Sequence, residues 1–432
     1  MKRLILLFSV IYIACQLLFI PENPGFFFWR HQIVLFSGFV GFGLMTLCMV
    51  LALRPGWLET RLHGLDKLYH LHKRAGITAG IFMILHWLAV KSGPWMVSAE
   101  LVSRPIRKGG AGEMSIFSQF RGEAVSMGEW ALYAMLILII ISLIRRFQYQ
   151  DFSLSHKLLG IVYLLGAAHS IMLTPHSGGN WVIAILVLTL SITGLWAAWV
   201  SLSGQIGRKK KHSGQVIQVE RPAEDIMVVT LKLDNTIDYL PGQFAFIDFR
   251  DGEKAHPFTI LRYSPDTREM EFAIKKLGDY TEHLITSLQS GSSIILEGPY
   301  GGFTLDHSRE QIWIGAGVGI APFVAMSRFL ENNSPDVSYP VTLYYCVHSE
   351  VEAIFLPELK RVAGNVAGMT VVPCISDNGS RLQTGTLQTR HTLSQAAVMY
   401  CGTTSFGESL RRTLTQYGLV NKRFEQERFD FR

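Results

Sequence analysis

Four histidines inside apolar segments have the residue type and spacing that most clearly predict chemistry. His72 and His86 lie in one apolar run, and His156 and His169 lie in another. At a helical rise of 1.5 Å per residue, the 14-residue spacing separates the first pair by about 21 Å and the 13-residue spacing separates the second by about 19.5 Å. Both runs begin at the same predicted membrane face, so two helices present imidazoles at two matched depths. Because imidazole is a common axial ligand of haem iron, the pattern predicts two stacked bis-histidine haems.

The angular positions of these histidines fit one helix better than the other. At about 100° per residue, His72 and His86 fall within roughly 40° of each other, whereas His156 and His169 are roughly 140° apart. An irregularity in the second helix, or haems approached from different sides, would reconcile the second pair. His70 lies about 160° from His86, so we prefer His72 as the ligand. The alternative is four buried histidines that hydrogen-bond to neighbouring helices, and their matched depths argue against it.

A glycine-rich turn in the second half of the chain predicts a nucleotide site. A buried strand at residues 311–314 runs into the sequence GAGVGIAP at residues 315–322, which leads into a helical pattern. Glycines at such a turn let backbone amides approach a pyrophosphate at a helix N-terminus. The alternative is a turn that only packs a helix tightly on a strand.

Three earlier segments add candidate flavin contacts. HPFT at residues 256–259 follows a strand, and KKLGDYT at residues 275–281 runs from a strand into a helix. A hydroxyl, a glycine amide and a helix N-terminus at the second segment can hold another phosphate group. GPYGG at residues 298–302 forms a further turn. Each alone has an ordinary turn as its alternative, so their order along the chain carries the prediction.

The elements that must position these residues differ between two halves of the chain. The 432 residues are 49% hydrophobic and only 17% charged, and the long apolar runs are confined to residues 1–203. Because a membrane-spanning helix needs about 20 apolar residues, we expect six spans. They are residues 3–20, 31–53, 72–91, 128–145, 155–173 and 181–202.

Basic residues predict the orientation of these spans. Short loops rich in Lys and Arg, such as residues 54–74 and the run Arg208 to Lys211, identify the cytoplasmic face. Both termini and the second half of the chain are therefore expected on that face. The outer loop at residues 92–127 also carries basic residues, namely Arg104, Arg107, Lys108 and Arg121.

The remaining bulk features exclude several classes of protein. A net charge of +6, with basic clusters beside apolar runs, is explained by membrane orientation rather than by binding of nucleic acid. Five cysteines without a CxxC pair make a disulfide scaffold or an iron–sulfur site a poor fit. Lys2-Arg3 and the apolar residues 4–20 could form a signal peptide, but no cleavage site is obvious, so we expect a retained first helix.

The chain resembles the ferric reductase and NADPH oxidase superfamily, including its bacterial members. The resemblance rests on LHKRAGI around His72, the two histidine spacings, HPFT, GDYT, GPYGGF, GAGVGIAP and the late Cys401-Gly402, and it covers nearly all 432 residues. It implies a six-helix transmembrane haem-binding bundle (residues 1–205), an FAD-binding antiparallel β-barrel (206–305) and an α/β NAD(P)-binding domain (306–432). Short alternating strands after residue 214, followed by alternating β and α segments, agree with the last two.

The resemblance also implies roles for individual residues, in three groups. The groups line or cover the flavin, contact its phosphates, and bind the nicotinamide nucleotide. The flavin would be lined or covered by His256, Pro257, Phe258, Thr259 and the aromatic Phe431 near the C-terminus. The flavin phosphates would be contacted by Lys275, Gly278 and Thr281. The nicotinamide nucleotide would be bound by Gly315, Gly317, Gly319, Pro322, Cys401 and Gly402. Thr403 stands where the family usually has Pro.

The function implied is transmembrane electron transfer. NAD(P)H gives up a hydride and a bis-histidine haem takes single electrons, so FAD must stand between NAD(P)H and two haem b groups. We expect a multi-pass protein of the inner (cytoplasmic) membrane with O2 or a ferric chelate as the outer acceptor, and no acid–base catalytic residue. The alternatives are a subunit that feeds a quinone or partner protein, and a membrane scaffold with a degenerate reductase module. Ser349 favours NADPH over NADH, and Glu350 opposes it.

Overall fold

The computed structural model describes residues 2–16, 20–62, 64–103, 119–144, 149–174, 181–305, 308–333 and 336–427. These residues form two compact units. The helical unit comprises the chain up to Leu58 together with Lys67–Ile206, and the α/β unit comprises Glu59–Asp66 and the chain from Gly207 onward.

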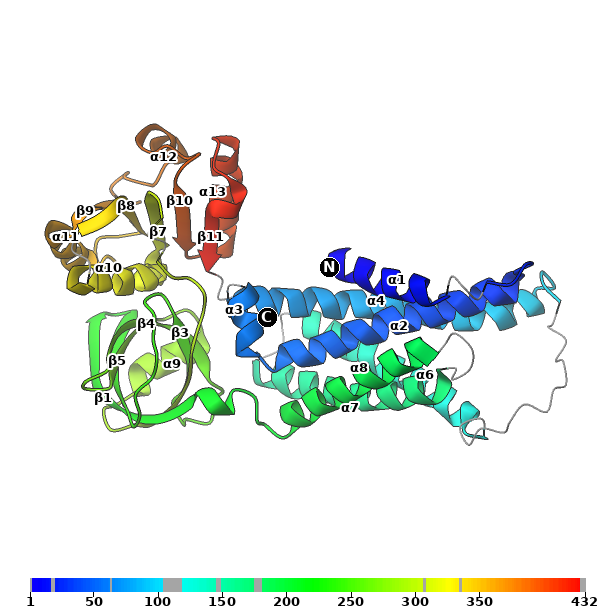
Figure 1. Cartoon of the computed structure of the whole chain (residues 1–432). Coiled ribbons are helices and arrows are strands. Elements are labelled where there is room, and N and C mark those ends of the chain that lie inside the picture. The colour runs from blue at the N-terminus through cyan, green and yellow to red at the C-terminus, as the bar shows by residue number, and fades with distance from the viewer. Residues whose placement is uncertain are drawn as a thin grey trace. The chain divides into compact units, whose positions relative to one another are not determined.

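The helical unit is built from long apolar helices that run alongside one another (Figure 1). Its helices are α1 (Lys2–Gln16), α2 (Phe26–Ala52), α3 (Gly56–Leu62, shared with the other unit), α4 (Leu65–Ser98), α6 (Arg121–Leu143), α7 (Tyr149–Leu173) and α8 (Trp181–Leu202). Within the described residues, five of them (α2, α4, α6, α7 and α8) are long and apolar enough to cross a membrane. The described part of α1 has 15 residues, which is short for a span, so the sixth crossing remains a prediction.

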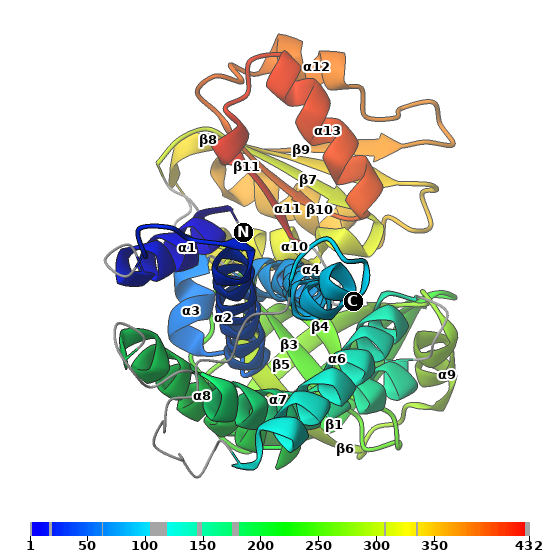
Figure 2. The same ribbon diagram turned by 90° about the vertical axis from the view of Figure 1, so that its right-hand side faces the viewer.

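The spacing between these helices is uneven. Helices α6, α7 and α8 pack side by side as neighbours, and α2 packs on α8, whereas the backbone of α4 stays farther from α7 than α6 and α8 do. Seen end-on, α8, α7 and α6 form a curved layer with α2 and α4 on its concave side (Figure 2). Directly packed helices lie about 8–10 Å apart, so α4 and α7 are not packed directly on each other along their backbones.

The first part of the α/β unit is a closed antiparallel barrel, as the sequence predicts. Its strand order is β1-β2-β5-β4-β3-β6, and α9 (Asp279–Ser287) lies between β5 and β6 in the chain. The strands are β1 (Lys211–Ala223), β2 (Ile226–Leu233), β3 (Phe244–Asp248), β4 (His256–Ser264), β5 (Glu269–Lys275) and β6 (Ser293–Tyr300). Their inward side chains, including Met227, Leu231, Phe272 and Leu296, are fully buried, which closes the barrel around a packed interior.

The second part is a five-stranded parallel sheet of order β11-β10-β7-β8-β9. Helices α10 and α11 cover one face, and α12 and α13 cover the other. The elements are β7 (Gln311–Ala316), α10 (Ala321–Asn333), β8 (Asp336–Val347), α11 (Leu356–Asn365), β9 (Ala367–Ile375), α12 (Thr384–Arg390), β10 (Ala397–Cys401), α13 (Thr404–Gln416) and β11 (Phe424–Glu427). The strand order reverses between β7 and β10, and ligands of such sheets bind at the carboxyl ends of the strands at that reversal.

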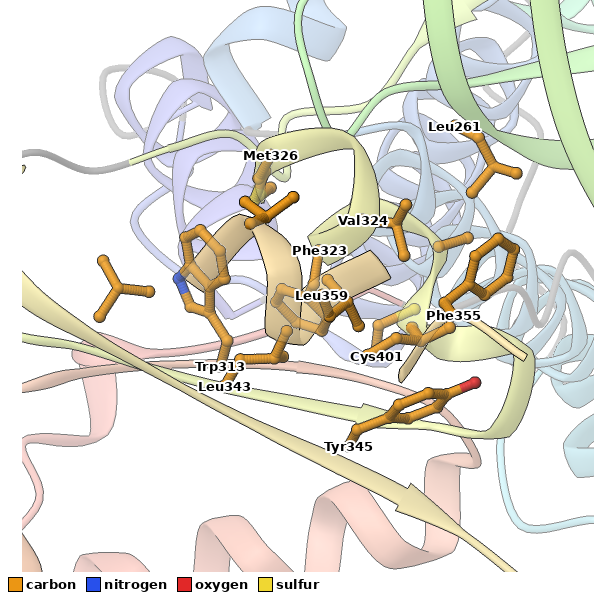
Figure 3. Close-up of a cluster of buried hydrophobic side chains, with 14 of the residues drawn as sticks. Leu261, Trp313, Phe323, Val324, Met326, Leu343, Tyr345, Phe355, Leu359 and Cys401 are labelled. Carbon is orange, nitrogen blue, oxygen red and sulfur yellow. The ribbon is translucent and has the colours of Figure 1, made fainter. Parts of the chain in front are cut away.

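Barrel and sheet share one hydrophobic cluster. It joins Leu261 of the barrel to Trp313, Phe323 and Tyr345 of the sheet layer (Figure 3). Beside it, the guanidinium of Arg328 on α10 donates to both carboxylate oxygens of Glu358 on α11, at 2.7 and 2.9 Å, and to Glu271 on β5 at 2.7 Å. A partly buried charge with two carboxylates therefore ties the barrel to the sheet.

Replacing this arginine should destabilise the α/β unit. In Arg328→Met, the partly buried Glu358 loses this cation and Glu271 keeps only its longer ion pair with Arg262 at 3.4 Å, which costs about 3–5 kcal/mol. We expect the temperature of FAD release from the full chain in detergent to fall by roughly 10 °C. Arg361→Met is the matched control, because Arg361 pairs with Glu331 but its side chain is 56% exposed, so the temperature of FAD release should hardly change. Equal effects of the two substitutions would contradict the role of Arg328.

Candidate functional site

The four histidines of the helical unit meet in two pairs. The ring centres of His72 (α4) and His156 (α7) are 5.7 Å apart, and those of His86 and His169 are 6.2 Å apart. Because metal–imidazole bonds are about 2 Å long, two imidazoles on opposite sides of one metal ion have ring centres about 6 Å apart. Both pairs have this spacing, so the residues present fit an iron porphyrin at each level.

The second ring nitrogen of each histidine is already engaged. His72 Nδ1 donates to Cys48 O at 3.1 Å, His86 Nδ1 to Val34 O at 2.9 Å, and His169 Nδ1 to Ala124 O at 2.8 Å. His156 Nδ1 lies 3.0 Å from Ser142 Oγ. A proton on Nδ1 leaves the lone pair of Nε2 for a metal, and metal-binding histidines usually make such a hydrogen bond.

Two helix glycines make room for the outer pair. A Cβ atom at Gly38 on α2 would lie 3.0 Å from His86 Nδ1, and one at Gly128 on α6 would lie 2.2 Å from His169 Nδ1. Each glycine is four residues after the carbonyl that accepts the hydrogen bond, so the ring rests on the helix surface where a side chain is missing. Sequence reasoning missed both positions. Their only sequence signal is a glycine within a predicted apolar span, which is a weak one.

The predicted flavin segment forms the first half of β4. His256 pairs with Ile247 and Thr259 with Phe244 in the ladder between β3 and β4, and Phe258 and Thr259 are buried. The ring of His256 stacks on that of Tyr280, with centroids 4.0 Å apart and planes 13° apart. Burial lowers the pKa of His256, so its ring is uncharged at neutral pH. The structure thus brings HPFT and GDYT together, through a tyrosine that sequence reasoning did not single out.

The predicted FAD-phosphate contacts lie around the start of α9. Thr281 Oγ1 accepts from the amide of Leu277 at 2.9 Å and donates to Gly278 O at 3.1 Å, which holds this turn in place. No atom lies within 4 Å of where a Cβ of Gly278 would be, so its backbone is open to a ligand. That opening is what a bound phosphate group requires.

Lys275, which is predicted to contact an FAD phosphate, is already paired with two carboxylates. Its ammonium forms ion pairs with Glu352 at 2.8 Å and Asp225 at 3.2 Å. Burial alone would lower the pKa of Lys275, but its hydrogen bonds to the two carboxylates outweigh burial and raise it. The side chain is therefore charged and already bound to carboxylates, and its role toward FAD remains a prediction.

The glycine-rich turn lies at the reversal of strand order. Gly315 at the end of β7 pairs with Cys401 at the end of β10, and Cys401 pairs with Glu427 of β11. Gly319 packs against this row, because a Cβ there would lie 2.4 Å from the carbonyl oxygen of Cys401. Gly317 has a φ of +57° and open space where its Cβ would be. The turn thus contacts the end of β10 at Cys401 on one side and leaves its backbone exposed at Gly317 on the other, as a pyrophosphate site requires.

The other predicted nucleotide residues flank this row. Pro322 is buried in the first turn of α10, where a missing amide proton costs nothing. Gly402 follows Cys401 and has a φ of +156°. Cys401 is fully buried, and burial together with the neighbouring Glu427 raises the pKa of its thiol well above the ordinary value. Its sulfur therefore stays protonated and does not act as a nucleophile.

Glu427 is a buried acid that sequence reasoning missed. It is 5% exposed, and among the described residues its Oε2 has no hydrogen-bond partner. Burial, together with the nearby charge of Asp66, raises the pKa of Glu427 well above its ordinary value and so favours the protonated carboxyl group. A neutral carboxyl next to Cys401 can donate a hydrogen bond at the edge where the nucleotide is expected. The only sequence signal for this acid was a glutamate within the last strand, β11.

The raised pKa of Glu427 makes stability depend on pH. Between the unfolded pKa and the higher folded pKa, the folded state holds one more proton, so the free energy of unfolding falls as pH rises, by up to about 1.4 kcal/mol per pH unit. We expect Glu427→Gln to remove this part of the slope. The check is the temperature of FAD release measured from pH 5 to pH 8, and parallel curves for the two proteins would refute the assignment.

A cavity of about 480 Å³ lies at the carboxyl ends of β8 and β9. Glu350 and Lys360 both line it, and Asn378 donates to Glu350 Oε1 at 3.0 Å. One charge of each sign faces the place where the adenosine ribose is expected. The preference for NADPH that Ser349 suggested is therefore not strengthened.

Some predicted residues lie outside the described part of the chain. They are Phe431, proposed to cover the flavin, and the outer-loop residues Arg104, Arg107 and Lys108.

Three segments of the chain match known family models. Residues 37–167 match the ferric reductase like transmembrane component, residues 211–304 an FAD-binding domain, and residues 313–411 an oxidoreductase NAD-binding domain.

The similar curated proteins match only part of this chain. The chain is 32% identical over 162 residues to the ferredoxin–NAD(P)(+) reductase component of the naphthalene 1,2-dioxygenase system of Pseudomonas putida, covering 37% of this chain and 48% of that protein. It is 29% identical over 170 residues to the reductase component of propane 2-monooxygenase of Mycolicibacterium smegmatis, covering 38% and 48%. The chain thus spans about half the length of these curated relatives.

Among solved structures, the flavohemoglobin of Malassezia yamatoensis with bound FAD and heme resembles the chain with a TM-score of 0.51 and 16% identity over 98% of both chains, a likeness of fold alone. The three family matches carry the assignment, since they follow one another along one chain. Together with the apolar helices, they show that this chain is a membrane-embedded oxidoreductase of the ferric reductase and NADPH oxidase superfamily, with a reductase module of the ferredoxin-reductase type.

Proposed function

We propose that the protein carries electrons across the membrane, from NAD(P)H on the cytoplasmic face through FAD and two bis-histidine haems to an acceptor on the outer face. One observation carries the proposal: two imidazole pairs face each other at two levels, with ring centres 5.7 and 6.2 Å apart and each Nδ1 within hydrogen-bond distance of an oxygen atom. A structural role would explain a buried histidine, but it would not explain two opposed pairs with the spacing of a shared metal ion.

The residues of the chain bind and orient, and none transfers a proton. Gly317 and Gly319 shape the turn for the nucleotide, while Cys401 and Glu427 border its expected ring position. Bound FAD would supply hydride acceptance and single-electron release, and haems held by the four histidines would supply single-electron transfer. Because a histidine from each of two helices would hold each haem, an acceptor would receive electrons without binding to the metal.

The orientation and the acceptor follow from charge and chemistry. The basic residues between α2 and α4, such as Arg54 and Arg61, favour a cytoplasmic position for that loop and for the α/β unit at the inner membrane. O2, giving superoxide, and a ferric chelate are both acceptors that suit a haem edge.

A second candidate is a subunit that feeds a quinone or a partner protein. It is favoured by the curated relatives, whose names describe reductase components of multi-component oxygenases. In this case, the protein alone would show reduced haem and little turnover with either O2 or ferric citrate.

The experiment is anaerobic reduction of the purified, haem-replete protein by NADPH and by NADH. We expect FAD and two haems per chain, with both haems reduced before O2 or ferric citrate is admitted and reoxidised afterward. His72→Leu and His156→Leu should lose the inner haem and block reduction of the outer one, while nucleotide still reduces the flavin. A protein without Soret absorbance, or histidine variants that keep full transmembrane activity, would refute the proposal.

A further inference from the structure

The hydrogen bond behind His156 differs in kind from the other three. His72, His86 and His169 each donate through Nδ1 to a backbone carbonyl, whereas His156 Nδ1 faces the side-chain hydroxyl of Ser142 on α6 at 3.0 Å. A backbone acceptor survives any substitution that keeps the helix. A serine acceptor can be removed by changing one atom.

The direction of this hydrogen bond follows from the second contact of the serine. Ser142 Oγ donates to Leu138 O, one turn earlier in α6, at 2.7 Å. A hydroxyl has one proton and two lone pairs, so with its proton on Leu138 O it can only accept from His156. The proton of His156 is therefore on Nδ1, which leaves the lone pair of the ring on Nε2.

We infer that Ser142 is a positioning residue for the inner haem site: it selects the tautomer of His156 and sets how strongly this imidazole donates electrons to iron. The inference rests on the proposed function. A hydrogen bond from Nδ1–H to an acceptor makes the imidazole more basic, and hydrogen bonds of this kind tune the reduction potential of a haem. Ser142 acts through His156 and touches neither nucleotide nor flavin.

The two levels differ accordingly. The outer pair is tethered by carbonyls at 2.9 and 2.8 Å, and the inner pair by a carbonyl at 3.1 Å and a hydroxyl at 3.0 Å. The two hydrogen bonds of the inner pair are therefore the longer ones. Of these four hydrogen bonds, only the one at His156 uses a side-chain oxygen. Removing that side chain should act on one haem and spare the other.

The test is potentiometric titration of purified full-length Ser142→Ala, with visible and electron paramagnetic resonance spectra. We expect one of two haem transitions to move to higher potential and one of two low-spin ferric signals to change, with the other unchanged. The shifted transition should persist in a His86→Leu background, which removes an outer ligand. Ser142→Thr keeps an acceptor hydroxyl and should restore the wild-type values. Thr189→Val removes a hydroxyl that donates to Ile185 O on α8 away from the histidines, and should change neither transition.

Each outcome decides the inference. No shift, equal shifts of both transitions, or the same shift in Ser142→Ala and Ser142→Thr would overturn it. If Ser142→Ala does not retain haem, Ser142→Cys, whose thiol is a weak acceptor, should give a smaller shift of the same transition, and unchanged potentials there would overturn it as well. A wild-type protein without two haems would refute the proposed function itself, which the wild-type spectrum reveals before any variant is made.

Discussion

Gly128→Ala should abolish binding of the outer haem while leaving the inner haem and the flavin in place. The added methyl group would lie 2.2 Å from Nδ1 of His169, so the ring must leave its position and lose its hydrogen bond to Ala124 O. Loss of the hydrogen bond that orients a metal-binding histidine lowers the affinity of the site about 10- to 100-fold, and displacement of the histidine itself lowers it further. We expect haem content to fall from two to one per chain and electron transfer to the outer acceptor to stop.

The control is the same substitution six residues earlier in the same helix. Gly122→Ala places a methyl group where no atom lies within 4 Å, so haem content and activity should be unchanged. The haem content of Gly38→Ala should lie between those of Gly128→Ala and Gly122→Ala, since the new Cβ would lie 3.0 Å from His86 Nδ1. Two haems with native spectra in Gly128→Ala would show that His169 is not an axial ligand. Haem content is measured by pyridine haemochrome, with FAD content reporting folding.

Gly319→Ala should stop nucleotide from reducing the flavin. The new Cβ would lie 2.4 Å from the carbonyl oxygen and 2.6 Å from the carbonyl carbon of Cys401. Backbone atoms of a central strand cannot yield as the end of a side chain can, so the glycine-rich turn must move instead. A displacement of about 1 Å at a hydride-transfer site costs about 100-fold in rate. We expect the rate of flavin reduction by NAD(P)H, measured by anaerobic stopped flow, to fall by that factor.

Two measurements separate this loss from general damage. Dithionite should still reduce flavin and both haems in Gly319→Ala, since neither cofactor site contains this residue. Gly364→Ala, in α11, adds a methyl group to open space and should reduce the flavin at the wild-type rate. A wild-type rate in Gly319→Ala would mean that the turn does not bind the nucleotide.

The sequence alone determined features that depend on local order. Apolar runs predicted five of the helices, because burying a backbone in lipid requires about 20 apolar residues in a row. Alternating strands predicted the barrel, and a strand–turn–helix pattern predicted the parallel sheet. These signals are local, so they can be read without knowing what each segment contacts. The residue types of the candidate ligands, His72, His86, His156 and His169, were equally plain.

Only the tertiary structure decided which groups meet. On an ideal helix His156 and His169 are roughly 140° apart, yet each ring lies beside a histidine ring of the same helix α4, with ring centres 5.7 and 6.2 Å apart. The hydrogen bond from His156 to Ser142, the space at Gly128, and the contact of Gly319 with Cys401 join residues from different elements. Such contacts depend on how helices and strands pack, and a single sequence records the spacing along each element but not the distance between them.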